Sequence, residues 1–410
     1  MLITDVPPSK AFSGALFTDR LCNFLPEGSL AAFIVVNPEL KHTPVSPELG
    51  WIPMEYCEKP NESGILTGIK KYGAFFAAIS QLATLTKELC MSMFKIPGIV
   101  RRIHRFGKGQ KADRVWCILQ GQTMIRIALR VSGKLGVPLY TQVWDPPQWW
   151  LGANSIDWIT FGRIMRIFGR TMAESRRMAA ASFNMAKIYK ERHGADTVPV
   201  IPSLDKSIIR YPEIKTGNEK LIIAIAGQIY ATDAWNSLLE ALDSAGWVVN
   251  GKRVIVRIMS YYLPDLSGHN ARYIEFLGYR SQEESISILS ESDILYLPYW
   301  FDTRYDEVVK LSFPSKLTAY LAAGRPVLCH APGYASPSIF IAENDSGYIC
   351  SVKEKESILK IIENIDMDPA AAARKTENGR IALQKYLSDE NMAKQFAEFL
   401  EINPGDIRYG

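Results

Sequence analysis

The segment Leu311–Leu328, LSFPSKLTAYLAAGRPVL, is the most informative stretch of this 410-residue sequence. Pro314 suits the first turn of a helix, because the amide hydrogen that proline lacks would have no helical partner there. Gly324 then ends the helix, and Pro326–Cys329 has the length and apolar character of a buried strand. A helix followed at once by a buried strand is the unit from which parallel α/β sheets are built.

Short apolar strands alternate with helices on both sides of this segment. We expect strands at Leu2–Thr4, Leu30–Val36, Val115–Leu119 and Val137–Val143, and then at Leu221–Ala226, Val254–Met259, Ile274–Gly278 and Ile294–Leu297. Such alternation predicts an α/β fold with two doubly wound, Rossmann-like domains. We place the domains at residues 1–203 and 204–385, and we expect Met172–Ala181 to be helical.

Charge is distributed unevenly between the two halves. Residues 1–200 carry 25 Lys and Arg against 15 Asp and Glu, whereas the remainder carries 22 against 28. Much of the excess lies in Lys95–Arg114, where apolar residues are interleaved with basic ones. One interpretation is a segment that lies on an anionic membrane surface, and the other is a solvated helix that packs by its apolar face. No recognised nucleic-acid module is evident, so we expect no nucleic-acid partner.

Cysteine spacing and hydropathy favour a cytoplasmic protein without a metal or cofactor. None of the six cysteines forms a Cys-x-x-Cys pair, and no Cys/His cluster has the spacing of a zinc site. No run approaches about 18 consecutive apolar residues, and the N-terminus does not resemble a signal peptide. We therefore expect a cytoplasmic location, peripheral on the inner face of the membrane if the basic segment binds lipid.

The helix N-terminus at Ser315 and Lys316 is a candidate diphosphate site. Its free amides and partial positive charge suit an anion, and the two side chains add a hydroxyl and a cation. A lysine in the first turn of a helix is electrostatically misplaced unless an anion lies nearby; the alternative is an ordinary solvated lysine. The glycine motifs of dinucleotide oxidoreductases and P-loop NTPases are absent.

The same stretch, Phe313–Leu328, resembles the donor-binding helix of GT-B fold glycosyltransferases, in particular glycosyltransferase family 4. Ile274–Tyr279 and Ser292–Tyr299 resemble two further landmarks of the C-terminal domain of that family, and Leu221–Gly227 resembles its opening strand. The resemblance implies two Rossmann-like domains that face each other across a nucleotide-sugar cleft. It also implies that the helix within residues 386–410 returns to the first domain.

The resemblance assigns donor roles to individual residues. Gly227 and Gln228 would lie close to the donor phosphates, and Gly278 and Tyr279 near the nucleobase. Ser315 and Lys316 would hold the diphosphate.

One family motif is missing from the sequence. Retaining members carry Glu-x7-Glu, and its two positions are occupied here by Leu311 and Ala319. Ribose recognition must therefore come from elsewhere, with Asp306 and Glu307 as candidates. The stereochemistry of transfer stays open, and so does the activity itself.

The acceptor side is expected at the loop that follows Val137–Val143. Trp144 and Trp149 offer aromatic surfaces for sugar rings, and Asp145 is a candidate general base, although an Asp-Pro-Pro turn is the alternative. His330 follows another strand and is a candidate contact to the donor, or a structural histidine. Gly14, in the first loop, would allow the backbone to approach the donor closely.

These features favour a metal-independent glycosyltransferase of the hexosyltransferase type. It would transfer a sugar from a nucleotide-sugar donor to a glycan or lipid-linked acceptor, as in polysaccharide biosynthesis. The alternatives are an inactive GT-B-like binding or scaffold protein and a nucleotide-sugar epimerase of the same fold.

Overall fold

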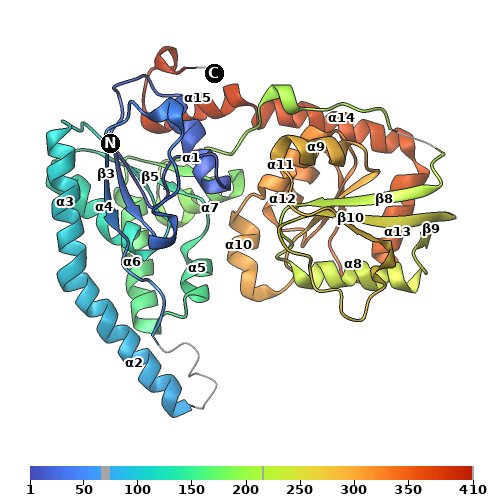
Figure 1. Cartoon of the computed structure of the whole chain (residues 1–410), viewed down its shortest axis with the longest axis horizontal. Helices are drawn as coiled ribbons and strands as arrows, with labels where there is room; N and C mark the ends of the chain where they lie inside the picture. Colours follow the sequence, from blue (N-terminus) through green and yellow to red (C-terminus); the bar gives the residue numbers. More distant parts are fainter. Residues whose placement is uncertain (66–73, 215–216, 409–410) are drawn as a thin grey trace. The chain divides into compact units, whose positions relative to one another are not determined.

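The computed structural model describes residues 1–65, 74–214 and 217–408, which form two compact units (Figure 1). The first unit contains Met1–Val200 and the C-terminal residues from Ala393 onward, and the second contains Ile201–Met392. The first unit thus ends at Val200 rather than at residue 203, and the chain re-enters it at Ala393 rather than at 386. The division into domains at residues 1–203 and 204–385 stays a prediction.

The first unit is built on a parallel seven-stranded sheet with the order β3-β2-β1-β4-β5-β6-β7. The strands are β1 (Leu2–Thr4), β2 (Ala32–Val36), β3 (Met54–Glu58), β4 (Val115–Ile118), β5 (Leu139–Val143), β6 (Arg177–Ala180) and β7 (Thr197–Pro199). The strands β1, β2, β4 and β5 are buried along their whole length, because the sheet has helices on its faces.

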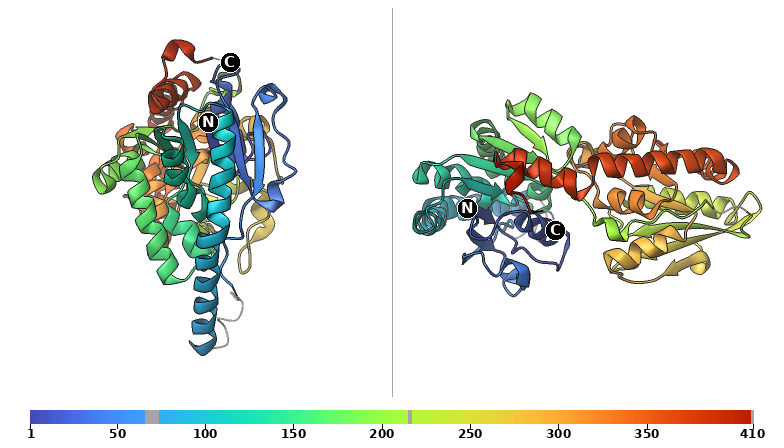
Figure 2. Two further views of the ribbon diagram at one scale, coloured as in Figure 1. Left: turned by 90° about the vertical axis from the view of Figure 1, so that its left-hand side faces the viewer. Right: turned by 90° about the horizontal axis from the view of Figure 1, so that it is seen from above.

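The helices of the first unit are α1 (Ser13–Asn23), α2 (Ala74–Cys90), α3 (Ile96–Gly109), α4 (Gln122–Leu135), α5 (Pro147–Ala153), α6 (Trp158–Glu174), α7 (Phe183–His193) and the end of α15 (Asp389–Leu400). A π-helical turn, Met91–Lys95, joins α2 to α3. The two helices form one continuous column, whose α2 end extends beyond the sheet of this unit (Figures 1 and 2). The sequence also predicts a helix at Gly68–Phe94, and the start of this range lies among residues 66–73, outside the described residues.

The second unit has a parallel sheet with the order β11-β10-β8-β12-β13-β14, to which β9 adds an antiparallel pair with β10. Its strands are β8 (Lys220–Ala226), β9 (Val248–Val249), β10 (Lys252–Met259), β11 (Ile274–Phe276), β12 (Ile294–Pro298), β13 (Val327–His330) and β14 (Tyr348–Cys350). Its helices are α8 (Thr232–Ser244), α9 (Gln282–Ser290), α10 (Asp306–Leu311), α11 (Ser315–Ala323), α12 (Ser336–Glu343), α13 (Lys355–Met367), α14 (Pro369–Tyr386) and the start of α15.

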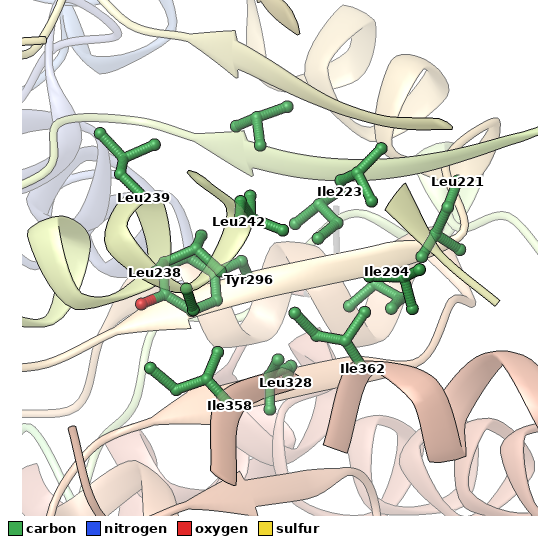
Figure 3. Packing of buried hydrophobic residues seen from close by; sticks show 14 of the residues in the cluster. Leu221, Ile223, Leu238, Leu239, Leu242, Ile294, Tyr296, Leu328, Ile358 and Ile362 are labelled. Atoms are coloured by element: carbon green, nitrogen blue, oxygen red, sulfur yellow. The ribbon is translucent and has the colours of Figure 1, made fainter. Parts of the chain in front are cut away.

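The core of the second unit lies between the sheet and the helices α8 and α13. Figure 3 shows Leu238 and Leu242 of α8 and Ile358 and Ile362 of α13 with the buried strand residues, among them Tyr296 of β12. These strands are near-continuous apolar runs because a parallel sheet is covered on both faces.

The prediction of two doubly wound, parallel α/β domains is confirmed by the order of the strands in both sheets. The expected helix at Met172–Ala181 is wrong in its second half: α6 ends at Glu174, and Arg177–Ala180 forms β6 beside β5. No helix among the described residues is long and apolar enough to cross a membrane.

Candidate functional site

The chain changes direction in the second sheet between β8 and β12. From β8 it proceeds outward through β10 to β11, and then crosses to β12 and continues through β13 to β14. Such a switch point leaves a crevice beyond the carboxyl ends of the two central strands, where ligands of doubly wound domains bind. Gly227 directly follows β8, so the candidate donor residues lie at this switch point.

Gly227 and Lys316 are in direct contact there. A Cβ atom on Gly227 would lie 3.1 Å from Cε of Lys316, and the φ of Gly227 is +81°, which glycine tolerates best. The ammonium of Lys316 donates to the carbonyl oxygen of Gln228. The glycine therefore lets the lysine reach across the loop that follows β8.

Among the described residues, no carboxylate compensates the charge of Lys316. No ion pair joins Lys316 to any residue in the described ranges, and its Nζ lies 5.5 Å from the centroid of the Tyr230 ring. Burial lowers the pKa of Lys316 to about 8, because no anion stabilises the charged form. Lys316 also lies in the first turn of α11, where the exposed amides already favour an anion. This arrangement suits a phosphate group.

Three further predicted donor residues lie on the same unit. Ser315 is exposed at the first position of α11. Gly278 follows β11 with φ +71°, and Tyr279 beside it is 55% exposed. The ring of Tyr279 stacks on Tyr261 with centroids 4.3 Å apart, which forms an exposed aromatic surface suited to a flat base or a sugar.

His330 is a core residue at the end of β13. It is completely buried, its Nδ1 lies 2.6 Å from the hydroxyl of Tyr296, and its Nε2 lies 2.8 Å from the carbonyl oxygen of Val352. Burial lowers its pKa to about 4, so the imidazole is neutral and Nε2–H donates to Val352. This placement favours the structural interpretation of His330 over a contact with the donor.

The positions of the missing Glu-x7-Glu motif are apolar in the structure as well. Leu311 is fully buried, and Ala319 is half-buried in α11. Of the two acidic residues considered for ribose recognition, Asp306 accepts a hydrogen bond from Tyr334 and pairs with Lys310 at 3.3 Å.

The first unit has its own switch point, between β1 and β4, and it carries a buried charged cluster. The ammonium of Lys59 lies 2.8 Å from Asp5 Oδ2, 3.4 Å from Glu62 Oε2 and 3.0 Å from the carbonyl oxygen of Gln120. Glu62 also accepts from the backbone amide of Thr123 at 2.6 Å, at the start of α4. Burial lowers the pKa of Lys59, but Glu62 and Asp5 outweigh it, so the net shift is upward. Two carboxylates thus already surround this cation.

The predicted acceptor residues follow β5 in the same unit. The ring of Trp144 packs over Gly14, where a Cβ would lie 3.1 Å from the ring, and its centroid lies 6.2 Å from Phe17. Gly14 thus makes room for a tryptophan. Asp145 is half-buried beyond the end of β5, and Trp149 is exposed on α5.

Metal ligation has no candidate among the described residues, where no group of three or more His, Cys, Asp or Glu could hold an ion.

No protein-family model matches this chain, and no curated protein matches it. Solved structures do match, and they are glycosyltransferases of the GT-B fold. Alr3699/HepE of Anabaena, solved in complex with UDP, has a TM-score of 0.63 and 13% identity over 98% of this chain and 99% of its own. Sucrose-phosphate synthase of Thermosynechococcus elongatus has a TM-score of 0.60 and 12% identity over 98% of both chains.

A glycosyltransferase from Rickettsia africae matches with a TM-score of 0.59 and 13% identity over 98% of this chain and 99% of its own. At such identities the likeness shows the fold, so this chain has the two Rossmann-like domains of GT-B glycosyltransferases. The resemblance to that fold is confirmed, whereas membership of family 4 stays a prediction.

Sequence reasoning missed Lys59, Glu62, Tyr230 and Tyr261 as members of the two sites. Tyr230 carries a signal, because it lies in the same loop as Gln228. Lys59 and Glu62 follow β3, an edge strand, and only the fold brings them to Asp5.

Proposed function

We propose that this protein is a glycosyltransferase that binds a nucleoside diphosphate sugar at the switch point of its second unit. The observation that carries the proposal is Lys316, a cation without a carboxylate partner among the described residues, next to Gly227 and the N-terminus of α11. A diphosphate supplies the missing negative charge and accepts from the free amides. Tyr279 and Tyr261 offer the stacking surface for the base.

The ligand of a solved structure with a similar fold supports this choice of donor. Alr3699/HepE was solved with UDP and with UDP-glucose, so a uridine diphosphate hexose is the first donor to test. We assign a glycan or a lipid-linked saccharide as acceptor, with Trp149 as an exposed stacking surface and Asp145 as the general base. In this proposal the chain acts in polysaccharide biosynthesis at the cytoplasmic face of a membrane.

We further propose that transfer is independent of a metal ion. The leaving diphosphate gains negative charge as the glycosidic bond to the donor breaks. Lys316 and the amides of α11 are positioned to stabilise that charge in a desolvated site. Activity should therefore persist in EDTA, and a complete loss that Mg²⁺ or Mn²⁺ restores would overturn this part of the proposal.

A catalytically inactive nucleotide-binding protein is the second candidate. Leu311 and Ala319 replace the two carboxylates of the retaining family motif, and Leu311 is buried in the core. Such a protein would bind the nucleotide as described here and would not turn it over.

Nucleotide binding and turnover separate these functions. We expect UDP or another nucleoside diphosphate to raise the melting temperature of the protein, because a ligand at 100 times its Kd adds about 2.7 kcal/mol. Slow release of free hexose from the matching nucleotide sugar would support the transferase. Binding without any release or transfer would select the inactive protein, and the absence of binding by all common nucleotides would refute both.

A further inference from the structure

Helix α2 has its polar residues turned inward and its apolar residues turned outward. On the inner face, Ser80 donates to the carbonyl oxygen of Ile65 at 2.6 Å, Thr84 accepts from the amide of Ile65 at 2.9 Å, and Glu88 pairs with Arg126 at 2.8 Å. Ser80, Thr84 and Glu88 are all buried. An ordinary surface helix shows the opposite polarity.

The outer face of α2 and of the π turn carries an exposed apolar ridge. Its members are Phe75, Phe76, Ile79, Leu82, Leu89, Met93 and Phe94, of which Phe75, Leu82 and Phe94 are 73%, 66% and 71% exposed. Five of these seven residues belong to α2, the helix whose end extends beyond the sheet of the first unit (Figure 2). Contiguous exposed apolar side chains of this kind mark an interaction surface.

Helix α3 continues the column with a basic outer face. Arg101, Arg105 and Lys108 are exposed, and none of them forms an ion pair with a described residue. The apolar residues interleaved with them, Ile96, Ile99, Val100 and Ile103, are buried against the unit. Lys95–Arg114 therefore packs by its apolar face, as one of the two interpretations of the sequence holds, and most of its cations face outward.

The π turn brings the apolar ridge and the basic face onto one side of the column. Leu89, before the π turn, and Arg101, after it, are twelve residues apart, which in an α-helix would rotate the face by about 120°. A π turn accommodates one extra residue, which reduces the rotation between the two faces by about 100°. The apolar side chains of Leu82, Leu89 and Met93 therefore lie on nearly the same side of the column as Arg101, Arg105 and Lys108.

Two surface hollows are lined in part by the basic residues of α3. One of about 480 Å³ is lined by Arg101, His104, Arg105, Lys108 and Gly109. The other, of about 610 Å³, lies between α3 and α4 and is lined by Pro97, Val100, Arg101, Leu129, Arg130, Gly133 and Lys134. No carboxylate lines either hollow, so both suit anionic groups of headgroup size.

We propose that the α2–α3 column docks on an anionic lipid bilayer. The apolar ridge enters the boundary between headgroups and acyl chains, while Arg101, Arg105 and Lys108 contact the lipid phosphates. The apolar ridge lies next to a face of cations without carboxylate partners among the described residues. A membrane surface has the matching arrangement, because its apolar acyl layer lies next to a layer of lipid phosphates. The inference is independent of the proposed transferase activity.

The test is the binding of the full chain to vesicles of phosphatidylcholine with and without 30 mol% phosphatidylglycerol. We expect binding to the anionic vesicles that weakens with salt. A ridge variant with Leu82→Gln, Met93→Gln and Phe94→Gln should bind at least about tenfold more weakly, because it loses three exposed apolar side chains. A charge variant with Arg101→Glu, Arg105→Glu and Lys108→Glu should bind phosphatidylglycerol vesicles no better than neutral ones.

Matched controls carry the same changes on other surfaces. Leu263→Gln, Met367→Gln and Ile381→Gln remove exposed apolar groups from the second unit, and Lys220→Glu, Lys360→Glu and Lys394→Glu make the same change in net charge. Both control variants should bind vesicles like the wild type. Equal binding by the ridge variant and its control would overturn the inference. So would a wild-type dimer that the ridge variant converts to a monomer without any loss of vesicle binding.

Cys90 provides a direct readout of insertion. It is exposed on α2, whereas the other five cysteines are buried, so a polarity-sensitive fluorophore can be attached there selectively. Its emission should shift to the blue with anionic vesicles and stay unchanged in the ridge variant. An unshifted probe on vesicle-bound wild type would overturn insertion of the ridge.

Discussion

The two units share a doubly wound topology and differ in the charge balance of their switch points. In the first unit, Lys59 lies between Asp5 and Glu62, and the three side chains are only 8–12% exposed. In the second unit, Lys316 contacts Gly227 and no carboxylate among the described residues. Each crevice holds one lysine, but only one lysine is neutralised by the protein itself.

The difference in charge balance indicates which of the two switch points favours an anionic ligand. A buried ion cluster with its own counter-charges is part of the folded core, because removing one partner leaves a buried charge unpaired. A half-buried cation without a counter-charge costs stability until a ligand provides one. The second switch point is therefore where we propose that the donor diphosphate binds, and in the first unit Asp145 is the residue that we propose for the acceptor side.

The largest effect is expected from Lys59→Met. Asp5 and Glu62 would remain buried without their cation, which should lower the free energy of unfolding by about 3–5 kcal/mol. Urea unfolding measures the change. Lys10→Met is the control, because Lys10 and Glu48 form an exposed pair worth at most about 1 kcal/mol. Equal effects of the two substitutions would show that the first switch point is not held together by its charges.

Asp145→Asn tests which unit supplies the base. If Asp145 removes the proton of the acceptor, turnover should fall about 100-fold or more, while nucleotide affinity stays unchanged. Steady-state transfer and calorimetric titration with nucleotide measure the two quantities. Full turnover would make Asp145 a turn residue and direct attention to Asp5, whose Oδ1 is buried without a partner among the described residues.

Lys316→Met should separate affinity from stability. Loss of a charge-assisted contact costs about 1.5–3 kcal/mol, so nucleotide affinity should fall about 10- to 100-fold. The ligand-free protein should become slightly more stable, by about 1 kcal/mol or 2–4 °C, since a cation without a counter-charge is replaced by an apolar side chain. Lys360→Met, on an exposed face of α13, is the control and should change neither quantity. Normal nucleotide binding by Lys316→Met would refute the donor site.

The smallest effect is the pH dependence of nucleotide binding. The pKa of Lys316 in the free protein is about 8, so the side chain is protonated at pH 7 and largely neutral at pH 9. Affinity should therefore fall about tenfold over that interval, as the protonated fraction falls. Lys316→Arg keeps its charge at both pH values, so its affinity should vary much less. An identical decline in both proteins would attribute the effect to another group.

The sequence predicts strands and helix ends correctly where the local sequence and the tertiary fold favour the same backbone conformation. The strand at Ile294–Leu297 and the end of α11 at Gly324 were predicted correctly, because apolar runs and glycine act locally. Pro314 was expected in the first turn of α11, but it is the extended N-cap residue directly before that turn. Arg177–Ala180 was not predicted correctly, because its Met-Ala-Ala core favours a helix in isolation. Hydrogen bonds to β5 decide its conformation in the fold.

The sequence by itself determined the fold class and the position of helix α11, because periodicity, proline and glycine positions are local properties of the chain. Only the tertiary structure decided that His330 is enclosed, that Lys59 is neutralised while Lys316 is not, and that α2 turns its apolar face outward. The charge state and exposure of a side chain depend on neighbours that are distant in the sequence, and those neighbours are set by the order of the strands.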